Sequence, residues 1–305
     1  MTLTDAMRAA CQAVGIEPPR GTKLGEWVKS PVIGKGRGNG SGRVMINSDG
    51  KTGVAWNHVS GQHMRFSEAG TSDAESIPPP KRDREAERRE AGERAEVARI
   101  CQRIVKACQP MQHPYLEAKG FPDELGLVIE DLRPLIPDHQ LGRDIAFRLP
   151  EGAGPWLIVP GRIEQQITTV QIIAPDGVKK NIYRGTMKGA AHRIATGSET
   201  WVCEGIATAL TVRAALRLLG RSATVLSAFS AANVAKVAGR IEGSIIAADH
   251  DRPLEQLHGK GTGEYYAAQS RRVWTQPEAL GDFNDWHQRD GLRAVALHLR
   301  GVIAG

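Results

Sequence analysis

Apolar and polar residues follow a pattern in the last third of the chain that predicts strands separated by helices. The helical segments have apolar residues on one stripe, whereas the strands are short apolar runs bounded by polar residues. The expected helices are residues 207–219, 231–240 and 264–272, and the expected strands are residues 199–203, 224–229, 244–248 and 272–275. Because parallel strands need a crossover that a helix can supply, this order predicts an α/β domain at 199–305, with a mostly parallel sheet flanked by helices.

The preceding stretch, residues 111–198, has shorter and more mixed elements. A short helix is expected at 113–120, where a glycine can end it. Strand-like pieces follow at 144–149, 156–159, 168–173 and 179–183. The turn sequence Ala174-Pro175-Asp176-Gly177 lies between the last two pieces and predicts that they pair as a hairpin. We therefore expect an α+β domain here.

The N-terminal residues 1–70 predict a small β-rich domain that follows a helix at 4–11. Apolar residues alternate with polar residues and glycines from Trp27 to Trp56, and turn sequences at 48–50 and 60–61 favour antiparallel strands. Segment 34–43, rich in glycine and basic residues, is interpreted as a loop that is either an inert hairpin tip or a contact to a nucleic-acid backbone. It lacks the Gly-Lys-Ser/Thr ending of a phosphate-binding loop, which argues against an NTPase.

Residues 71–110 connect this domain to the rest of the chain. A small, polar linker at 72–80 ends in three prolines. Dense charge of both signs then predicts a solvent-exposed helix at 81–106, supported by opposite charges four residues apart. Its apolar stripe begins only near Val97.

Composition narrows the range of partners. The formal charge of +6 and the pI near 9.2 favour an anionic partner such as nucleic acid. No apolar run is long enough to span a membrane, and the N-terminus lacks a signal-peptide core. The four cysteines lie far apart with no zinc-binding spacing, which predicts reduced thiols in a cytoplasmic protein without zinc.

Three acidic residues directly follow two of the predicted strands. Glu204 comes before Gly205 at the end of the first strand, and Asp249 and Asp251 follow the strand at 244–248. The carboxyl ends of parallel strands meet at one edge of a sheet, so we expect these carboxylates to lie together. Such a cluster is most stable around a cation, and oxygen ligands alone favour Mg²⁺ or Mn²⁺. An isolated Asp-x-Asp could equally cap a helix or pair with Arg252.

These motifs resemble the Toprim domain, the metal-binding fold shared by DnaG-type primases, topoisomerases and some nucleases. The resemblance implies that Glu204 is a general acid or base and that Asp249 and Asp251 bind metal. It also implies an auxiliary acidic position in the segment 281–286, filled by Asp282 or Asp285. A glycine at position 205 would let the amides of the following helix face a phosphate, although a simple turn explains it too.

The segment 111–198 is similar to the basal domain of phage and plasmid primases. The matching pieces are Pro-Tyr-Leu-x-x-Lys-Gly at 114–120, Ile-Val-Pro at 158–160, and Gln-Ile-Ile-Ala-Pro-Asp-Gly at 171–177 before Lys179 and Lys180. The N-terminal domain is similar to the N-terminal domain of the same group in the stretch Ala-Val-Gly-Ile-Glu-Pro-Pro at 13–19 and the later Asp-Gly turn, which implies that it contacts template without zinc. The residues expected to contact nucleotide or template, besides Gly205, are Lys179, Lys180, Arg184, Lys188 and Lys260, with Arg143 and Arg148 as weaker candidates. Trp27, Trp56 and His58 could stack on single-stranded bases or simply belong to the core.

Lys260 lies in the segment 253–263, an insertion relative to the family that is either a triphosphate contact or an inert surface loop. The resemblance as a whole implies a DNA primase of a mobile element that joins ribonucleoside triphosphates into short primers on single-stranded DNA. A replicative helicase would act in trans, since the chain has no Walker motif. The alternatives are a Toprim nuclease and a non-catalytic DNA-binding replication adaptor. A topoisomerase is disfavoured because none of the four tyrosines is a convincing nucleophile.

Overall fold

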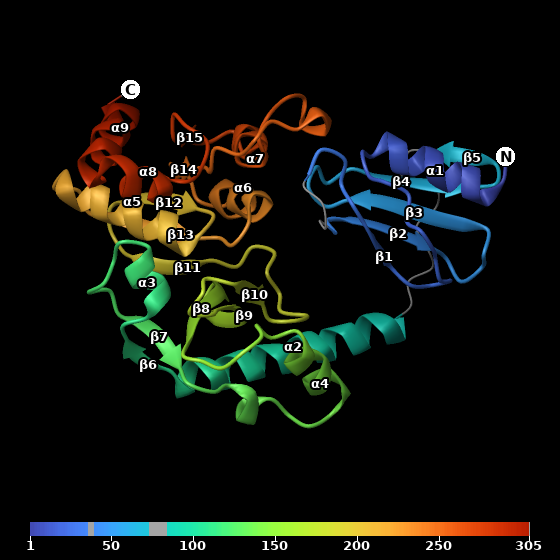
Figure 1. The fold of residues 1–305 in the computed structure, drawn as a ribbon, viewed down its shortest axis with the longest axis horizontal. Coiled ribbons are helices and arrows are strands. Elements are labelled where there is room, and N and C mark those ends of the chain that lie inside the picture. Colours follow the sequence, from blue (N-terminus) through green and yellow to red (C-terminus); the bar gives the residue numbers. More distant parts are fainter. Residues whose placement is uncertain (36–39, 73–83, 305) are drawn as a thin grey trace. The chain divides into compact units, whose positions relative to one another are not determined.

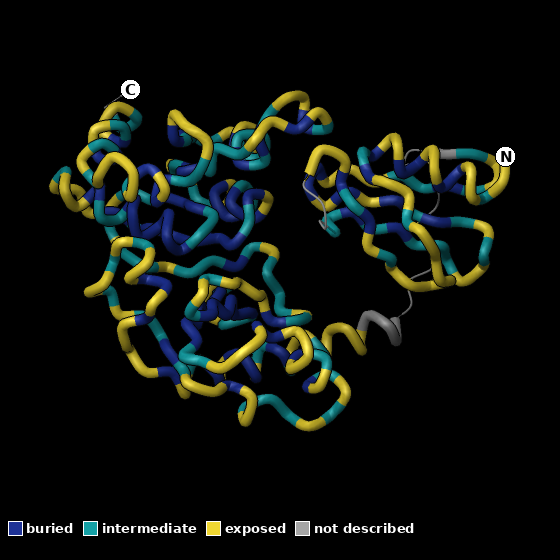
Figure 2. The backbone as a smooth tube through the Cα atoms, in the orientation of Figure 1, coloured by how far each residue is buried: buried dark blue, intermediate teal, exposed yellow. Residues whose placement is uncertain are grey.

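The computed structural model describes residues 1–35, 40–72 and 84–304 of the chain. These residues form two compact units, one of residues 1–82 with 252–262 and one of residues 83–251 with 263–305. Each unit has its own buried core, coloured dark blue in Figure 2. Residues 36–39 of the glycine-rich segment 34–43 and residues 73–80 of the linker fall outside the described residues.

The first unit contains an antiparallel sheet with one helix on it (Figure 1). Its elements are α1 (Leu3–Ala13), β1 (Val28–Ser30), β2 (Gly42–Ile46), β3 (Thr52–Asn57), β4 (His63–Ser67) and β5 (Gly70–Ser72), and the strands pair in chain order. Thr2 caps α1 and exchanges hydrogen bonds with Asp5 in a capping box. Helix α1 packs on β3 and β4 and shields the core residues Ala55 and Phe66. The turns expected at 48–50 and 60–61 join β2 to β3 and β3 to β4.

The segment 252–262 belongs to this first unit although it follows the Asp pair in sequence. It contains a short 3-10 helix, η3 (Glu255–Leu257), on which Leu257 is fully buried. Gln256 donates a hydrogen bond from Nε2 to the carbonyl oxygen of Ile33 over 2.9 Å. The insertion is therefore packed against the N-terminal domain.

The second unit begins with the long helix α2 (Arg84–Ala107) and an antiparallel sheet in the order β10-β9-β8-β7-β6. Its other elements are β6 (Gln109–Met111), α3 (Pro114–Ala118), β7 (Gly126–Ile129), η2 (Arg133–Leu135), α4 (Gln140–Phe147), β8 (Trp156–Ile163), β9 (Gln166–Ile173) and β10 (Lys179–Asn181). Val97, Ile100 and Ile104 of α2 pack on one face of this sheet, as the late apolar stripe predicts. The other face packs against helix α5 (Ile206–Leu218) through Ile173 and Leu157.

The same unit ends in a mostly parallel sheet in the order β11-β13-β12-β14-β15. Its elements are β11 (His192–Ala195), β12 (Glu199–Cys203), β13 (Ala223–Ser227), α6 (Ala231–Gly239), β14 (Ile245–Ala247), α7 (Thr262–Gln269), β15 (Val273–Thr275), α8 (Phe283–Asp290) and α9 (Leu292–Ala304). Strands β12 to β15 are parallel, and only β11 is antiparallel to its neighbour. The expected α/β architecture with a mostly parallel sheet is confirmed.

One predicted strand is wrong. Residues 144–149 lie at the end of helix α4 and just beyond it, not in a strand. His139 caps the helix by accepting a hydrogen bond from the amide of Gly142, and Ile145 faces the core while Phe147 is 87% exposed. A short apolar run cannot distinguish the two structures by its pattern alone. The hairpin expected from the turn at 174–177 is confirmed as β9 and β10.

None of the described helices is both long and apolar enough to cross a membrane. All four cysteines are buried and free.

Candidate metal centre at the edge of the parallel sheet

The topology of the parallel sheet brings Glu204 and Asp249 to the same edge. Strand β12 lies between β13 and β14, and Cys203 of β12 is paired in register with Ala247 of β14. Glu204 follows β12 directly, and Asp249 follows two residues after Ala247. Both carboxylates therefore lie beyond the carboxyl ends of neighbouring parallel strands, where open α/β sheets bind ligands.

A short backbone bridge brings the third acidic segment to this edge. The amide of His250 donates to the carbonyl oxygen of Gly281 over 2.9 Å, and the amide of Gly281 donates back to His250 over 3.0 Å. Asp282 is the next residue in the chain. The imidazole of His250 is hydrogen-bonded through Nδ1 to the carbonyl oxygen of Pro277 over 2.8 Å, so this side chain holds the backbone together.

Electrostatics identify Asp249 as the centre of the cluster. Burial raises the pKa of Asp249 well above its ordinary value of 3.8, and the nearby charges of Glu204, Asp282 and Asp251 raise it further. Its Oδ1 is sealed from solvent and has no hydrogen-bond partner among the described residues. An orphaned buried carboxylate oxygen surrounded by other acids is costly unless a cation or a proton neutralises it.

The other acids also hold the local backbone. Oδ2 of Asp251 accepts a hydrogen bond from the amide of Gly263, at the start of α7, over 2.9 Å. Asp282 caps α8 by accepting from the amides of Asn284 and Asp285, and Asp285 accepts from the amide of Asp282 over 3.1 Å. The helix-capping role that a lone Asp-x-Asp allows is thus observed for Asp251. Oδ1 of Asp249, by contrast, accepts no hydrogen bond from any described residue.

The donor set suits a hard divalent cation. Carboxylate oxygens are the ligands that Mg²⁺ and Mn²⁺ prefer. The nearby thiol of Cys203 is fully buried, and burial together with the charges of Asp249 and Asp282 raises its pKa, which disfavours the thiolate that would bind a softer metal. Within the described parts of the chain, no three acidic, histidine or cysteine side chains already form a metal-holding group. The acids surround Asp249 without forming a finished cage, so residues Glu204, Asp249, Asp251, Asp282 and Asp285 remain predictions as ligands.

The basic residues predicted to contact nucleotide lie on two different faces of the antiparallel sheet of the second unit, β10-β9-β8-β7-β6. Lys179 pairs in register with Ile173, on the face that packs toward α5, and its charge lowers the pKa of Asp249. Lys180 pairs with Ile172, on the opposite face under α2. Arg184 forms an ion pair with Glu93 of α2 at 2.5 Å. Lys179 is therefore the member of this group within electrostatic reach of the acidic cluster.

The remaining predicted contacts are dispersed. Lys188 is exposed and close enough to Lys236 to lower the pKa of that amine. Lys260 belongs to the first unit, where its carbonyl oxygen accepts a hydrogen bond from the amide of Leu254 over 3.0 Å. Arg143 and Arg148 form exposed ion pairs with Asp138 and Asp144.

Gly205 is the N-cap of α5 and has an ordinary extended backbone. A Cβ atom there would meet only the hydroxyl of Thr208, at 3.9 Å. The turn itself does not require glycine. The glycine at this position leaves open space in front of the first amides of the helix. Gly263 differs, because an added Cβ would lie 2.2 Å from the carbonyl oxygen of Asp249. A side chain cannot fit there, so glycine is needed for the close approach of α7 to the acidic strand end.

Sequence reasoning overlooked Gly263 and Asn284. Asn284 is fully buried and donates to the carbonyl oxygen of Lys119 over 2.8 Å and to the hydroxyl of Thr211 over 3.1 Å, which anchors α8. The sequence signal for Asn284 was its place within Asp-Phe-Asn-Asp, between two acids already considered. Gly263 had no local signal, because its neighbour is fourteen residues earlier in the chain.

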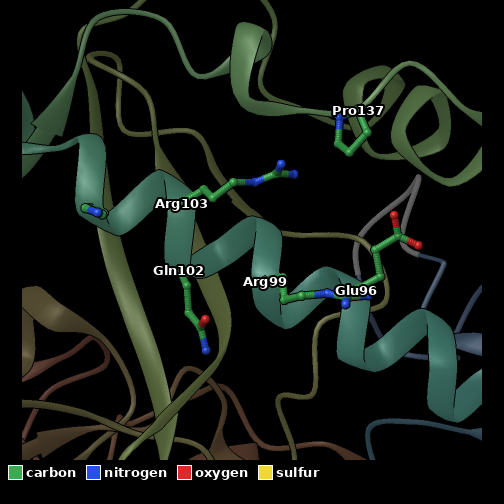
Figure 3. A pocket seen from close by; sticks show the side chains of 6 residues that line it. Glu96, Arg99, Gln102, Arg103 and Pro137 are labelled. Atoms are coloured by element: carbon green, nitrogen blue, oxygen red, sulfur yellow. The ribbon is translucent and has the colours of Figure 1, made fainter.

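A separate hollow along α2 is lined by Arg99, Arg103, Lys106, Gln102, Glu96 and Pro137 (Figure 3). Helix α2 covers one face of the antiparallel sheet β10-β9-β8-β7-β6, and α5 packs on the other face. This hollow is therefore not part of the acidic site.

The fold and the site define a mixed α/β protein with a partly parallel sheet and a carboxylate cluster at its carboxyl edge. A scan against known protein families finds no family that matches the chain. Among solved structures, the chain is similar to the primase fragment of the bacteriophage T7 primase-helicase protein, with 18% identity and a TM-score of 0.36. The match covers 47% of this chain and 62% of that chain. A similarity this distant leaves the residues of the site to indicate the function.

Proposed function

We propose that this protein is a DNA primase that joins ribonucleoside triphosphates into short primers on single-stranded DNA. The observation that carries the proposal is the buried Oδ1 of Asp249, which lies among other acids at the carboxyl edge of a parallel sheet and has no hydrogen-bond partner among the described residues. The sequence resemblance to Toprim primases supplies the substrate class. Its matching acids, Glu204, Asp249 and Asp251, are the acids that the fold gathers at this edge.

In this proposal Asp249 and Asp251 would hold Mg²⁺ or Mn²⁺, and Glu204 would accept the proton of the attacking 3′-hydroxyl. A cation held there would lower the pKa of that hydroxyl and neutralise charge on the triphosphate. Lys179 attracts the phosphates toward the cluster. Asp282 and Asp285 fix the start of α8 beside it, with Asp285 also 4.0 Å from the amine of Lys119.

The proposed partners are single-stranded DNA, ribonucleoside triphosphates and a helicase supplied in trans. Cytoplasmic localisation is part of the same proposal. Lys180, Arg184 and Lys188 are proposed as template contacts, and Gly205 as an open approach to a phosphate. Lys260 is proposed as a further nucleotide or template contact.

The test is primer synthesis on single-stranded DNA with labelled ribonucleotides and Mg²⁺, comparing the wild type with Asp249→Asn. This change keeps the size of the side chain and removes its charge. We expect product formation to fall by about 100-fold or more, since the cation supplies several kcal/mol of transition-state stabilisation. Asp138→Asn is the matched control, because that side chain is 93% exposed and lies on the basal domain.

Primers from the wild type and Asp138→Asn but not from Asp249→Asn would support a metal-dependent primase. Metal-dependent cutting of the template without primers would favour a nuclease that uses the same cluster. Equal synthesis by all three proteins would overturn the role of Asp249. If the wild type makes no primers and does not cut the template but still binds DNA, the result would favour a non-catalytic adaptor.

A further inference from the structure

The antiparallel sheet of the first unit has one face that α1 does not cover. Side chains alternate between the two faces along each strand. On β3, Gly53 and Ala55 are buried under α1, whereas Trp56 is 37% exposed. Residues paired in register share a face, so the partners of Trp56 define the uncovered side.

A row of basic and aromatic residues crosses four strands on this uncovered face. Lys29 of β1 pairs with Arg43 of β2, Arg43 pairs with Trp56 of β3, and Trp56 pairs with His63 of β4. Arg65 of β4 lies on the same side, opposite Val54. We call Lys29, Arg43, Trp56, His63 and Arg65, together with Trp27 and His58, the aromatic-basic face.

The aromatic rings of this face are grouped around Trp56. Its ring centroid lies 4.1 Å from that of His58, at an interplanar angle of 39°. The ring of Trp27, which is 45% exposed, lies 6.2 Å away, and that of His63 lies 6.4 Å away. Two neighbouring tryptophans therefore remain partly exposed to water on this small domain, which is a feature of binding surfaces.

The charges of the face have one sign. Lys29, Arg43 and Arg65 are cations, and none of the seven residues of the aromatic-basic face is acidic. The positive charge of Arg43 and burial together lower the pKa of His58. Neighbouring positive charges on one face favour the binding of an anionic ligand.

We propose that the aromatic-basic face binds single-stranded DNA. The bases would stack on Trp56, Trp27 and the two imidazoles, and the phosphates would lie against Lys29, Arg43 and Arg65. A single strand exposes base faces that stack without regard to sequence, whereas a duplex hides them. An acidic peptide would use the cations alone and leave the tryptophans unexplained. The choice of DNA rather than RNA rests on the proposed function.

The core of the first unit lies on the opposite side of the sheet from the aromatic-basic face. It is closed by α1, with Ala10, Cys11, Ala55 and Phe66 almost inaccessible to solvent. The aromatic residues are therefore not required to complete that core. They are available for a ligand.

The experiment is binding of a fluorescein-labelled oligothymidylate, followed by fluorescence anisotropy with EDTA and without nucleotides. We expect Trp56→Ala to weaken binding by about 10-fold or more, because one stacked base contributes about 1–3 kcal/mol. Trp56→Tyr retains an aromatic ring and should keep most of the affinity. Phe147→Ala is the control for loss of an exposed ring, since Phe147 lies on α4 in the other unit and is 87% exposed.

Equal binding by the wild type and by folded Trp56→Ala would overturn the proposal, as would preference for duplex DNA. Weak binding by Trp56→Tyr as well would mean that stacking is not the interaction. If RNA binds more tightly than DNA, the choice of DNA is wrong. A wild-type protein that binds DNA through Trp56 but makes no primers would retain this face and lose the proposed function.

Discussion

The chain builds two surfaces of opposite charge by two different rules of β-structure. The acidic edge forms because parallel strands β12 and β14 end at the same side of a sheet. The aromatic-basic face forms because antiparallel pairing places Lys29, Arg43 and Trp56 side by side. Strand ends can be recognised in a sequence, whereas a face depends on register.

Each surface resists a further charge of its own sign. Burial and the neighbouring acids raise the pKa of Asp249, while burial and Arg43 lower the pKa of His58. Neutral side chains are favoured in both places until a ligand of opposite charge arrives. The comparison predicts a cation at one surface and a polyanion at the other, each independent of the other surface.

The largest effect is expected from Gly263→Ala at the acidic edge. The new Cβ would lie 2.2 Å from the carbonyl oxygen of Asp249, a backbone atom that cannot turn away. We expect the free energy of unfolding to fall by about 3 kcal/mol and primer synthesis to be lost. Urea denaturation and the primer assay measure the two effects, and binding to single-stranded DNA should persist in any folded fraction.

Gly92→Ala is the matched control for this change. Gly92 lies in α2 with no atom within 4 Å of an added Cβ, so alanine should stabilise the helix by about 0.5–1 kcal/mol. If Gly263→Ala is as stable as Gly92→Ala, then α7 does not approach Asp249 as closely as the structure indicates.

The next effect concerns the charge of Asp249 itself. Without Mg²⁺, Asp249→Asn should be more stable than the wild type at neutral pH, because it removes a buried charge that faces other acids. The folded-state pKa is raised above 3.8, so the wild-type carboxyl favours folding fully only below that pH and loses this contribution as pH rises toward the folded value. The stability difference should therefore grow with pH above about 4.

Adding Mg²⁺ should reverse this order. A cation bound only to the folded wild type stabilises it by about 2.7 kcal/mol at a hundred times its dissociation constant. Thermal unfolding with and without Mg²⁺ gives both quantities. A variant that gains as much from Mg²⁺ as the wild type would show that the cation binds elsewhere.

Much of the acidic edge could be predicted from the sequence, because its evidence is local. An apolar run followed by an acid identifies both a strand and its end, as at Glu204 and Asp249. The additional roles of Asp251 and Asp282 as helix caps could not be separated from metal binding without the geometry. The strand predicted at 144–149 is wrong because the apolar residues there are too few to distinguish a strand from the end of helix α4.

The aromatic-basic face could be predicted only in parts. Trp27, Trp56 and His58 were visible as candidates for stacking, but Lys29 and Arg65 were not considered. Which residues share a face depends on how β2, β3 and β4 are aligned, and a shift of one residue would move every side chain to the other side. The packing of the segment 252–262 on the first unit is also non-local, since Gln256 meets Ile33 far back in the chain.

Salt dependence should separate the charged from the aromatic part of the face. Each cation that contacts a phosphate adds about 0.7 to the slope of log affinity against log salt for a single strand. Arg43→Gln should lower the slope by about this amount, and Trp56→Ala should lower affinity with little change in slope. Lys51→Gln is the control, since Lys51 is an exposed cation in the turn before β3.

The smallest effect should come from His58 and pH. Burial and the charge of Arg43 lower the pKa of His58 below its ordinary value of 6.5 in the free protein. The free imidazole is therefore mostly neutral at pH 6.5. Phosphates at the face would raise that pKa, because they favour the charged imidazole. Binding would then take up a proton, and affinity would rise as pH falls from above 6.5 toward the free-state pKa.

We expect a gain of about threefold between neutral and mildly acidic pH for the wild type, because phosphates favour the charged imidazole. His58→Gln should bind with a flatter pH profile, whereas Asp249→Asn should follow the wild type because its change lies at the other surface. His63 also lies on this face, with its ring centroid 6.4 Å from that of Trp56. If the pH profile flattens in His63→Gln instead, the phosphates lie nearer β4 than β3. If it flattens in neither variant, proton uptake does not contribute to binding, and stacking and the three cations Lys29, Arg43 and Arg65 must explain the affinity.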